Sequence, residues 1–273
     1  MIKITLDYKE ISIIIQDFIK TYVKGSGYKG VVIGFSGGID SAVTSILCKK
    51  VFGKKNTHCL FMLDSATPKS DKNHIEILIE KFDLECQTRD ISKIIKNMTN
   101  NCFVKPDKIA LANMKARIRM TLLFEYANMT ESLVCGTSNK SEILLGYFTK
   151  YGDGGADIMP IGDLYKTQVY ELAKFLKIPK EIINKPPTAG LIKGQTDEKE
   201  LGFSYKILDK VIMGLEYKQN ISDIAVNTRL KKSDVEKIKN KRIKSQHKRY
   251  SPLIPKIGFR TPGFDWRSHI QID

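Results

Sequence analysis

The stretch Val31-Val32-Ile33-Gly34-Phe35-Ser36-Gly37-Gly38-Ile39-Asp40-Ser41 contains a strand, a sharp turn and the start of a helix. Its first five residues are apolar or glycine and three of them are β-branched, which is typical of a strand buried on both faces. The glycine pair can turn the chain sharply. The residues that follow predict a helix from Ile39 to about Val51, so the stretch forms the first half of a βαβ unit.

Outward from this stretch, strands and helices alternate along the chain. Further strands are expected over residues 57–63, 85–88 and 133–136, and helices over residues 8–22, 71–82, 113–126, 166–175, 198–216 and 231–245. Such alternation predicts right-handed crossovers and an α/β fold, a doubly wound parallel sheet flanked by helices. The length allows one large domain or two small ones. Ligands bind at the carboxyl ends of such strands, so the loops after Phe35, Leu63 and Gly136 are expected to carry function.

Composition limits the class of protein. The 273 residues are 42% hydrophobic and 27% charged, enough to bury a full core. We find no apolar run near the roughly 20 residues of a membrane span and no signal-peptide pattern, and we therefore expect a soluble, cytoplasmic protein without membrane association. The five cysteines are scattered and form no CxxC pair, which favours free thiols over disulfides or a zinc site.

The chain carries a formal net charge of +15. Of the 45 basic residues, 37 are lysine and 8 are arginine, a bias that compositional background explains in part. Ten basic residues fall between Arg229 and Arg249, against only Asp234 and Glu236. A solvated helix face and a phosphate-bearing ligand are both consistent with this segment.

The glycine turn is a predicted phosphate site. Glycines let backbone amides close on an anion, and the following helix aims its free N–H groups at the same point. Ser36 and Ser41 add hydroxyl donors, whereas Asp40 would repel a phosphate. A divalent cation held between carboxylate and phosphate removes that conflict. The loop is not GxxxxGK[ST], so γ-phosphoryl transfer is not expected; SGGxDS resembles the pyrophosphate loop of the N-type ATP pyrophosphatases.

Seven further motifs resemble, in order, those of the NAD synthetase family of that superfamily. They are NMKARIRM (113–120), CGTSNKSE (135–142), GYFTKYGDGGAD (146–157), PI with LYKT (160–167), PPTAGL (186–191), QTDE (195–198) and QHKR (246–249). The resemblance extends from about residue 10 to 250. It implies the Rossmann-like, adenine nucleotide alpha-hydrolase-like fold and one synthetase domain over residues 1–273, with a core at about 8–250 and an extended tail at 251–273.

The resemblance implies ammonia-dependent amidation of deamido-NAD to NAD. In the family the nicotinate carboxylate is adenylated by ATP with Mg²⁺, pyrophosphate leaves, and ammonia displaces AMP. Members are homodimers. Only about 30 residues precede the glycine loop, so we expect no glutaminase domain and expect ammonia as the nitrogen source. The partners implied are small molecules, without nucleic acid.

The family's site positions carry over one by one. Asp40 and Lys166 are the implied catalytic residues, and Asp40 and Glu142 the implied magnesium ligands. The implied ATP contacts are Gly34, Phe35, Ser36, Gly37, Gly38, Ile39, Asp40, Ser41, Thr137, Lys166 and Thr188. The implied deamido-NAD contacts are Arg117, Lys150, Asp157, His247 and Lys248. Many bacterial members have Asp-His where this chain has Ser138-Asn139, so that histidine has no counterpart here.

Two rival functions stay open at this level. A tRNA-modifying enzyme that adenylates a base would suit the basic excess, but the sequence lacks CxxC pairs and an arginine-rich face. A non-enzymatic nucleotide sensor would not need Asp40, Glu142 and Lys166, because binding adenosine requires no pyrophosphate chemistry.

Overall fold

The computed structural model describes residues 6–188, 190, 191, 194 and 196–261. Ala189 and Gln195 of the family motifs, and residues 262–273 of the expected tail, lie outside the described residues. Within the described part of the tail, residues 251–261 carry no helix or strand. No helix in these ranges is both long and apolar enough to span a membrane.

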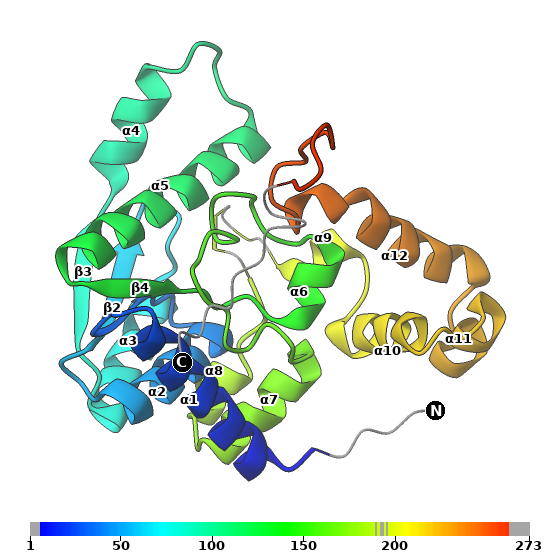
Figure 1. The fold of residues 1–273 in the computed structure, drawn as a ribbon, viewed down its shortest axis with the longest axis horizontal. Helices are drawn as coiled ribbons and strands as arrows, with labels where there is room; N and C mark the ends of the chain where they lie inside the picture. Colours follow the sequence, from blue (N-terminus) through cyan, green and yellow to red (C-terminus); the bar gives the residue numbers. More distant parts are fainter. Residues whose placement is uncertain (1–5, 189, 192–193, 195, 262–273) are drawn as a thin grey trace.

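Four parallel strands form the central sheet (Figure 1). They are β1 (Gly30–Gly34), β2 (Thr57–Leu63), β3 (Cys86–Asp90) and β4 (Ser132–Cys135). Their order is β3-β2-β1-β4, and Ile33 of β1 pairs with Cys59 on one side and Cys135 on the other. The chain winds outward from β1 in both directions, which confirms the predicted doubly wound parallel sheet.

Helices cover both faces of the sheet. One layer contains α1 (Tyr8–Gly25), α2 (Ile39–Phe52), α3 (Lys69–Phe82), α7 (Lys166–Phe175) and α8 (Lys180–Ile183). The other contains α4 (Ser92–Asn100) and α5 (Lys108–Met129). Successive side chains of a strand point to opposite faces, and accordingly Val31 and Ile33 pack in the first layer's core while Val32 packs against α5.

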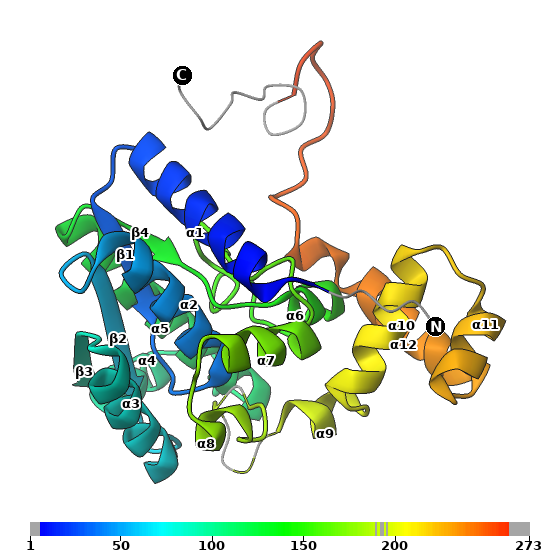
Figure 2. The same cartoon turned by 90° about the horizontal axis from the view of Figure 1, so that it is seen from below.

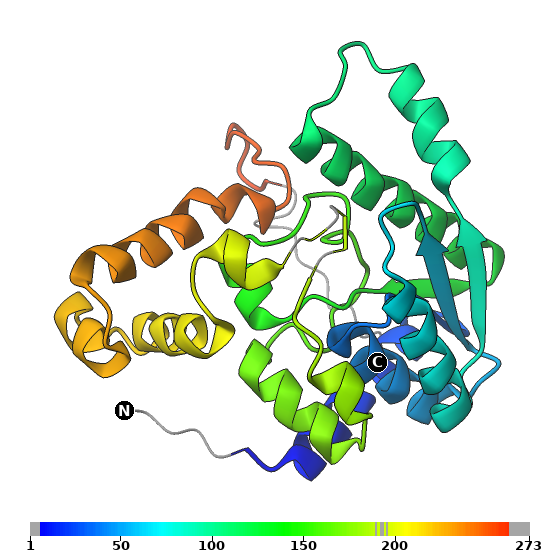
Figure 3. The same ribbon diagram turned by 180° about the vertical axis from the view of Figure 1, so that it is seen from behind.

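The remaining helices gather beside the sheet, on the side away from β3 (Figures 1 and 2). They are α6 (Lys140–Leu145), α9 (Asp197–Leu201), α10 (Tyr205–Glu216), α11 (Ile221–Thr228), α12 (Lys232–Lys244) and a 3-10 turn at Gln246–Lys248. Their buried residues form a separate apolar cluster that includes Leu145, Tyr205 and Val235. Seen from behind, these helices flank the loops that follow β4 (Figure 3).

The structure corrects some sequence expectations. The single helix expected over 198–216 is two helices, α9 and α10, because Gly202 has a φ of 83° and ends α9. Four short helices, α4, α6, α8 and α11, were not expected. All five cysteines are free thiols, and Cys48, Cys59 and Cys135 are buried. The basic segment contains α12, whose lysines are exposed, so most of it is a solvated helix face.

Candidate active site

A cavity of about 260 Å³ opens at the carboxyl ends of β1, β2 and β4. Its lining comes from all three loops that the sequence singled out, and also from the 185–197 segment. Of the implied ATP contacts, every one except Gly37 lines this cavity. The structure therefore brings the ATP set together from four separate segments of the chain.

The glycine turn is shaped by its own hydrogen bonds. Gly37 has a φ of 72°, and a Cβ there would lie 2.9 Å from the Asp71 carbonyl oxygen, so only glycine fits. The Ser36 and Ser41 hydroxyls lie 3.1 Å apart, and the Ser41 hydroxyl donates to the Gly38 carbonyl at 3.0 Å. Gly38 is the N-cap of α2 and has no side-chain capping bond, so the helix's first N–H groups stay available to an anion.

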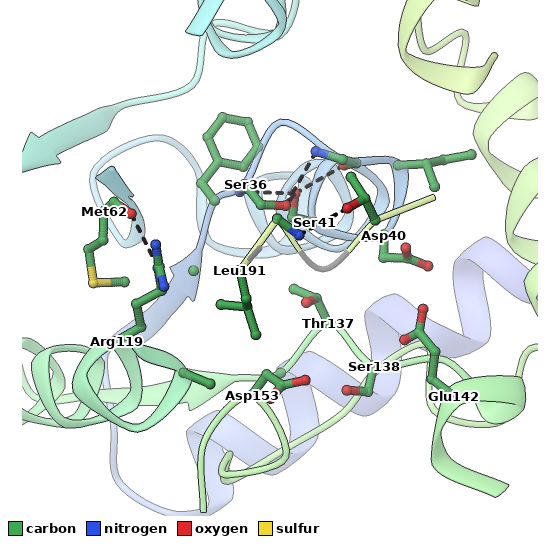
Figure 4. Close-up of a pocket in the computed structure, with 18 of the residues that line it drawn as sticks. Ser36, Asp40, Ser41, Met62, Arg119, Thr137, Ser138, Glu142, Asp153 and Leu191 are labelled. Carbon is green, nitrogen blue, oxygen red and sulfur yellow. Dashed lines mark hydrogen bonds between the residues drawn. The ribbon is translucent and has the colours of Figure 1, made fainter. Parts of the chain in front are cut away.

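Lys166 links the two implied magnesium ligands. Its Nζ lies 2.5 Å from Asp40 Oδ2 and 3.2 Å from Glu142 Oε1, and its side chain is only 2% exposed. Figure 4 shows Asp40 at the end of the glycine turn with the carboxyl group of Glu142 facing it. Asp40 thus meets two residues that lie more than 100 positions further along the chain, beside the phosphate loop.

The electrostatics of this cluster follow from burial. Burial raises the pKa of Glu142, Lys166 opposes that rise, Asp40 adds to it, and the result is about 7. Burial alone would lower the pKa of Lys166, but Asp40 and Glu142 outweigh it and raise the pKa above the usual lysine range. Lys166 is therefore a permanent cation held against two carboxyl groups.

Asn139 and Asp197 are site residues that the sequence analysis did not identify. The Asn139 side chain donates to Asp40 Oδ1 at 3.0 Å and caps α6. Asp197 is 4% exposed, lines the cavity and accepts from Tyr205 at 3.2 Å. Its pKa is raised by burial, which Lys166 opposes. The N-x-x-E spacing of Asn139 and Glu142 is a capping-box signal, and it could have indicated Asn139 from the sequence.

Thr137 and Thr188 both line the cavity. Thr137 follows β4, and Thr188 lies in the 185–197 segment, where its hydroxyl accepts from the Gly190 amide at 3.1 Å. Lys185 of this segment forms an ion pair of 2.6 Å with the buried Asp71 of α3.

The end of β2 carries a buried charge cluster that the sequence analysis also missed. Asp64 is 4% exposed, and its Oδ2 lies 3.0 Å from Lys115 Nζ and 3.3 Å from an Arg119 nitrogen. Arg119 also donates to the Met62 carbonyl at 3.2 Å (Figure 4). Burial raises the pKa of Asp64, but Lys115, the Ala66 amide and Arg119 outweigh it and hold the pKa below its usual range.

The implied deamido-NAD residues lie apart from the ATP set. None of the five is among the described residues that line the cavity. Arg117 Nε donates to the Lys150 carbonyl at 3.2 Å, and Lys150 Nζ donates to the His247 carbonyl at 2.7 Å. Lys248 Nζ donates at 2.7 Å to the carbonyls of both Gly146 and Phe148. The structure thus joins Arg117, Lys150, His247 and Lys248, from α5, the 146–157 loop and the 3-10 turn after α12.

Asp157 lies away from these four positions. Its Oδ2 accepts a hydrogen bond from the Val134 amide of β4 at 2.7 Å, and Asp157 as a whole is exposed to solvent. One carboxylate oxygen therefore anchors the loop that follows the sheet.

The donor set at Asp40 and Glu142 fits magnesium. Mg²⁺ takes oxygen ligands and is commonly bound through one or two carboxylates together with substrate phosphates. Here two carboxyl groups converge beside a turn built to hold phosphate, and a cation, Lys166, already lies between them. A second positive charge at this point would lower the pKa of Glu142 and so oppose the effect of burial.

Comparison with known proteins agrees with this geometry. Residues 11–252 match the family model described as NAD synthase. The NH(3)-dependent NAD(+) synthetase of Sulfurisphaera tokodaii is 42% identical over 97% of this chain and 95% of its own, and that of Methanococcus aeolicus is 44% identical over 81% and 88%.

Solved structures show the same likeness. An NH3-dependent NAD synthetase from Campylobacter jejuni, in complex with nitrate, has a TM-score of 0.79 and 34% identity, covering 92% of this chain and all of its own. An NMN synthetase from Francisella tularensis has a TM-score of 0.80 at the same identity and coverage. The order of the motifs, the phosphate turn with its acidic pair and these likenesses together place the chain in the NAD synthase family.

Proposed function

We propose that the protein is an ammonia-dependent NAD synthetase, which amidates deamido-NAD to NAD at the expense of ATP. The observation that carries the proposal is the meeting of Asp40, Lys166 and Glu142 beside the glycine turn. Simple nucleotide binding does not require a buried cation between two carboxyl groups. Release of pyrophosphate does require one, because the leaving group gains negative charge. The family membership favours this reading over the tRNA-modifying alternative.

The first step is adenylation. A carboxylate oxygen of the nicotinate attacks the α-phosphorus of ATP, and the bond from that phosphorus to the β-phosphate oxygen breaks. The departing pyrophosphate gains negative charge, which the amides of the glycine turn and the Lys166 ammonium stabilise. Because the Lys166 pKa is raised by its acidic neighbours, Lys166 stays charged throughout.

The second step is amidation. Ammonia attacks the carbonyl carbon of the mixed anhydride and loses a proton, and AMP leaves with the oxygen that bridged carbon and phosphorus. The Thr137 hydroxyl, which lines the cavity, is the proposed contact of the AMP phosphate. Deamido-NAD as a whole is held through Arg117, Lys150, Asp157 and the His247–Lys248 pair.

Asp40 and Glu142 are the proposed ligands of magnesium, which would neutralise the triphosphate when bound. Without ATP their charge is balanced by Lys166. With ATP present, Lys166 lies within reach of the same phosphates, so carboxylates, cation and phosphate form one alternating charge cluster.

The wider context of the enzyme is also part of the proposal. We propose a single synthetase domain over residues 1–273, a homodimer and a cytoplasmic location. The single-domain reading is supported by the curated relatives, since the chain covers 88% and 95% of the two named above. The names of these relatives give NH(3) as their nitrogen source.

The likeness to an NMN synthetase raises a second candidate substrate, the acid form of nicotinamide mononucleotide. The curated relatives named as NAD synthetases share more of the sequence, 40–44% against 34%. The dinucleotide is therefore the preferred substrate in our proposal. Offering both acids to the enzyme in competition decides between them.

The test is a turnover assay with purified protein, ATP, Mg²⁺, ammonium and deamido-NAD. We expect one NAD, one AMP and one pyrophosphate per turnover, and a higher kcat/KM for deamido-NAD than for the acid mononucleotide. AMP release at the same rate without any acid substrate would refute the proposal. A higher kcat/KM for the mononucleotide would reassign the substrate and leave the chemistry unchanged.

A further inference from the structure

Both the nitrogen and the oxygen of the Asn139 side-chain amide form hydrogen bonds within the acidic cluster of Asp40 and Glu142. The residue is 0% exposed and is the N-cap of α6. Its Nδ2 donates to Asp40 Oδ1 at 3.0 Å, and its Oδ1 accepts from the Glu142 amide at 3.1 Å. Its backbone amide donates to Glu142 Oε2 at 3.3 Å. One asparagine therefore contacts both of the proposed magnesium ligands.

The orientation of this amide group is fixed by chemistry. Rotating the carboxamide by half a turn would set its oxygen against the Asp40 carboxylate and its NH₂ group against the Glu142 N–H. Both contacts would then pair like with like, acceptor with acceptor and donor with donor. Only the observed orientation satisfies both neighbours, so the Asn139 side chain is locked.

The contacts divide the four carboxylate oxygens into two pairs. Asn139 holds Asp40 Oδ1 and Glu142 Oε2, one oxygen of each group. The other two, Asp40 Oδ2 and Glu142 Oε1, both face the Lys166 ammonium. Asn139 thus fixes how each carboxyl group is rotated. The oxygen of each group that Asn139 does not contact is directed to the position of the Lys166 ammonium.

We propose that Asn139 is a positioning residue that aligns Asp40 and Glu142 to share one divalent cation with the ATP phosphates. This inference rests on the proposed magnesium site. A helix cap needs only an oxygen acceptor, which serine, aspartate and asparagine all provide. The NH₂ group directed at Asp40 is the part that a cap does not require, so the two roles can be separated by substitution.

The test compares Asn139→Ser and Asn139→Gly with the wild type. Serine keeps an acceptor for α6 and glycine is tolerated at an N-cap, while both remove the donor to Asp40. Asp7→Ala is the matched control, because Asp7 caps α1 through the Lys9 amide at 2.8 Å, away from the cavity. Mn²⁺ affinity is measured by electron paramagnetic resonance with α,β-methylene-ATP present, and folding by circular dichroism.

We expect both Asn139 variants to bind Mn²⁺ about tenfold more weakly, as for other partners of metal ligands, with Asp7→Ala within about twofold of the wild type. In steady-state kinetics the KM for Mg·ATP should rise, while the KM for deamido-NAD stays unchanged. Unaltered Mn²⁺ affinity in a folded variant, an equal loss in Asp7→Ala, or failure of both Asn139 variants to fold would overturn the inference. A wild type that binds no Mn²⁺ would remove the metal site itself, even if NAD synthesis is intact.

Discussion

Replacing Lys166 by methionine tests the charge cluster at the centre of the site. Methionine keeps the length of the buried stem and removes the ammonium that lies 2.5 Å from Asp40 and 3.2 Å from Glu142. Removing one partner of a buried ion pair costs about 3–5 kcal/mol, because a charge is left buried and unpaired. Both carboxyl groups line the cavity and keep some access to water, so the lower end, about 3 kcal/mol, applies.

The stability loss should depend on pH with a defined sign. Glu142 has a pKa of about 7, raised above its usual value, and a raised carboxyl pKa means that the folded state holds more protons. Its stabilising contribution is therefore present below the unfolded value, near 4.3, and is lost as pH rises through the folded pKa. Without Lys166 the pKa of Glu142 rises further. The difference in stability between the wild type and the variant should therefore widen from pH 6 to pH 8.

The assay is thermal unfolding at both pH values, with and without Mg²⁺ and α,β-methylene-ATP. A loss of about 3 kcal/mol corresponds to a Tm lower by about 6–12 °C in a chain of this size. Mg²⁺ with the analogue should recover part of that loss by supplying a cation between the carboxyl groups. We also expect kcat to fall about 10²–10³-fold, as for loss of one donor to a developing anion.

Lys174→Met is the matched control. It lies on the same helix, its side chain is 57% exposed, and its ion pair with Glu171 is a surface pair. The control should change neither Tm nor kcat. A Lys166→Met variant with a wild-type Tm and less than about a tenfold loss of kcat would refute the reasoning. A stability difference from the wild type that narrows towards pH 8 would also refute it.

Four further substitutions test single features. Asp40→Asn should abolish turnover with the fold retained by circular dichroism, and near-normal activity would remove it as a metal ligand. Gly37→Ala should cost about 1–2 kcal/mol from its positive φ and raise the KM for ATP, whereas Gly53→Ala, with a similar φ of 71° but open space around its Cβ, should leave that KM unchanged. Arg249→Met removes bonds of 3.0 and 2.9 Å to two carbonyls at the end of α6, so the KM for deamido-NAD should rise while that for ATP does not. Asp64→Asn should lower the free energy of unfolding at pH 7, and the difference should shrink as pH falls below about 4 and vanish below the folded pKa, because a lowered carboxyl pKa stabilises fully above the unfolded value and the contribution is lost through the folded one.

Much of the fold could be predicted because its signals are local. The β-branched runs at β1 and β2 and the glycine turn between β1 and α2 mark buried strands and a crossover in any context. The short helices could not be predicted in this way. For example, α6 has six residues, too few to show a helical period, and it is stabilised by the Asn139–Glu142 capping box.

The candidate site could be predicted in its residues but not in its pairing. The resemblance named Asp40, Glu142 and Lys166 separately, and no spacing in the sequence shows that one ammonium contacts both carboxyl groups. Asp64 and the contact of Asn139 with Asp40 were missed because both exist only once distant segments meet. Asp64, for instance, is 51 residues from Lys115 in sequence and 3.0 Å from it in space.

The central claim is that the nicotinate carboxylate is adenylated before ammonia enters, and oxygen transfer tests it most directly. Deamido-NAD is labelled with ¹⁸O in its carboxylate and converted with ATP, Mg²⁺ and ammonium, and the AMP is analysed by mass spectrometry. We predict one ¹⁸O atom in AMP for each NAD formed, since AMP leaves with the oxygen that attacked the α-phosphorus. Unlabelled AMP formed alongside NAD would contradict the account.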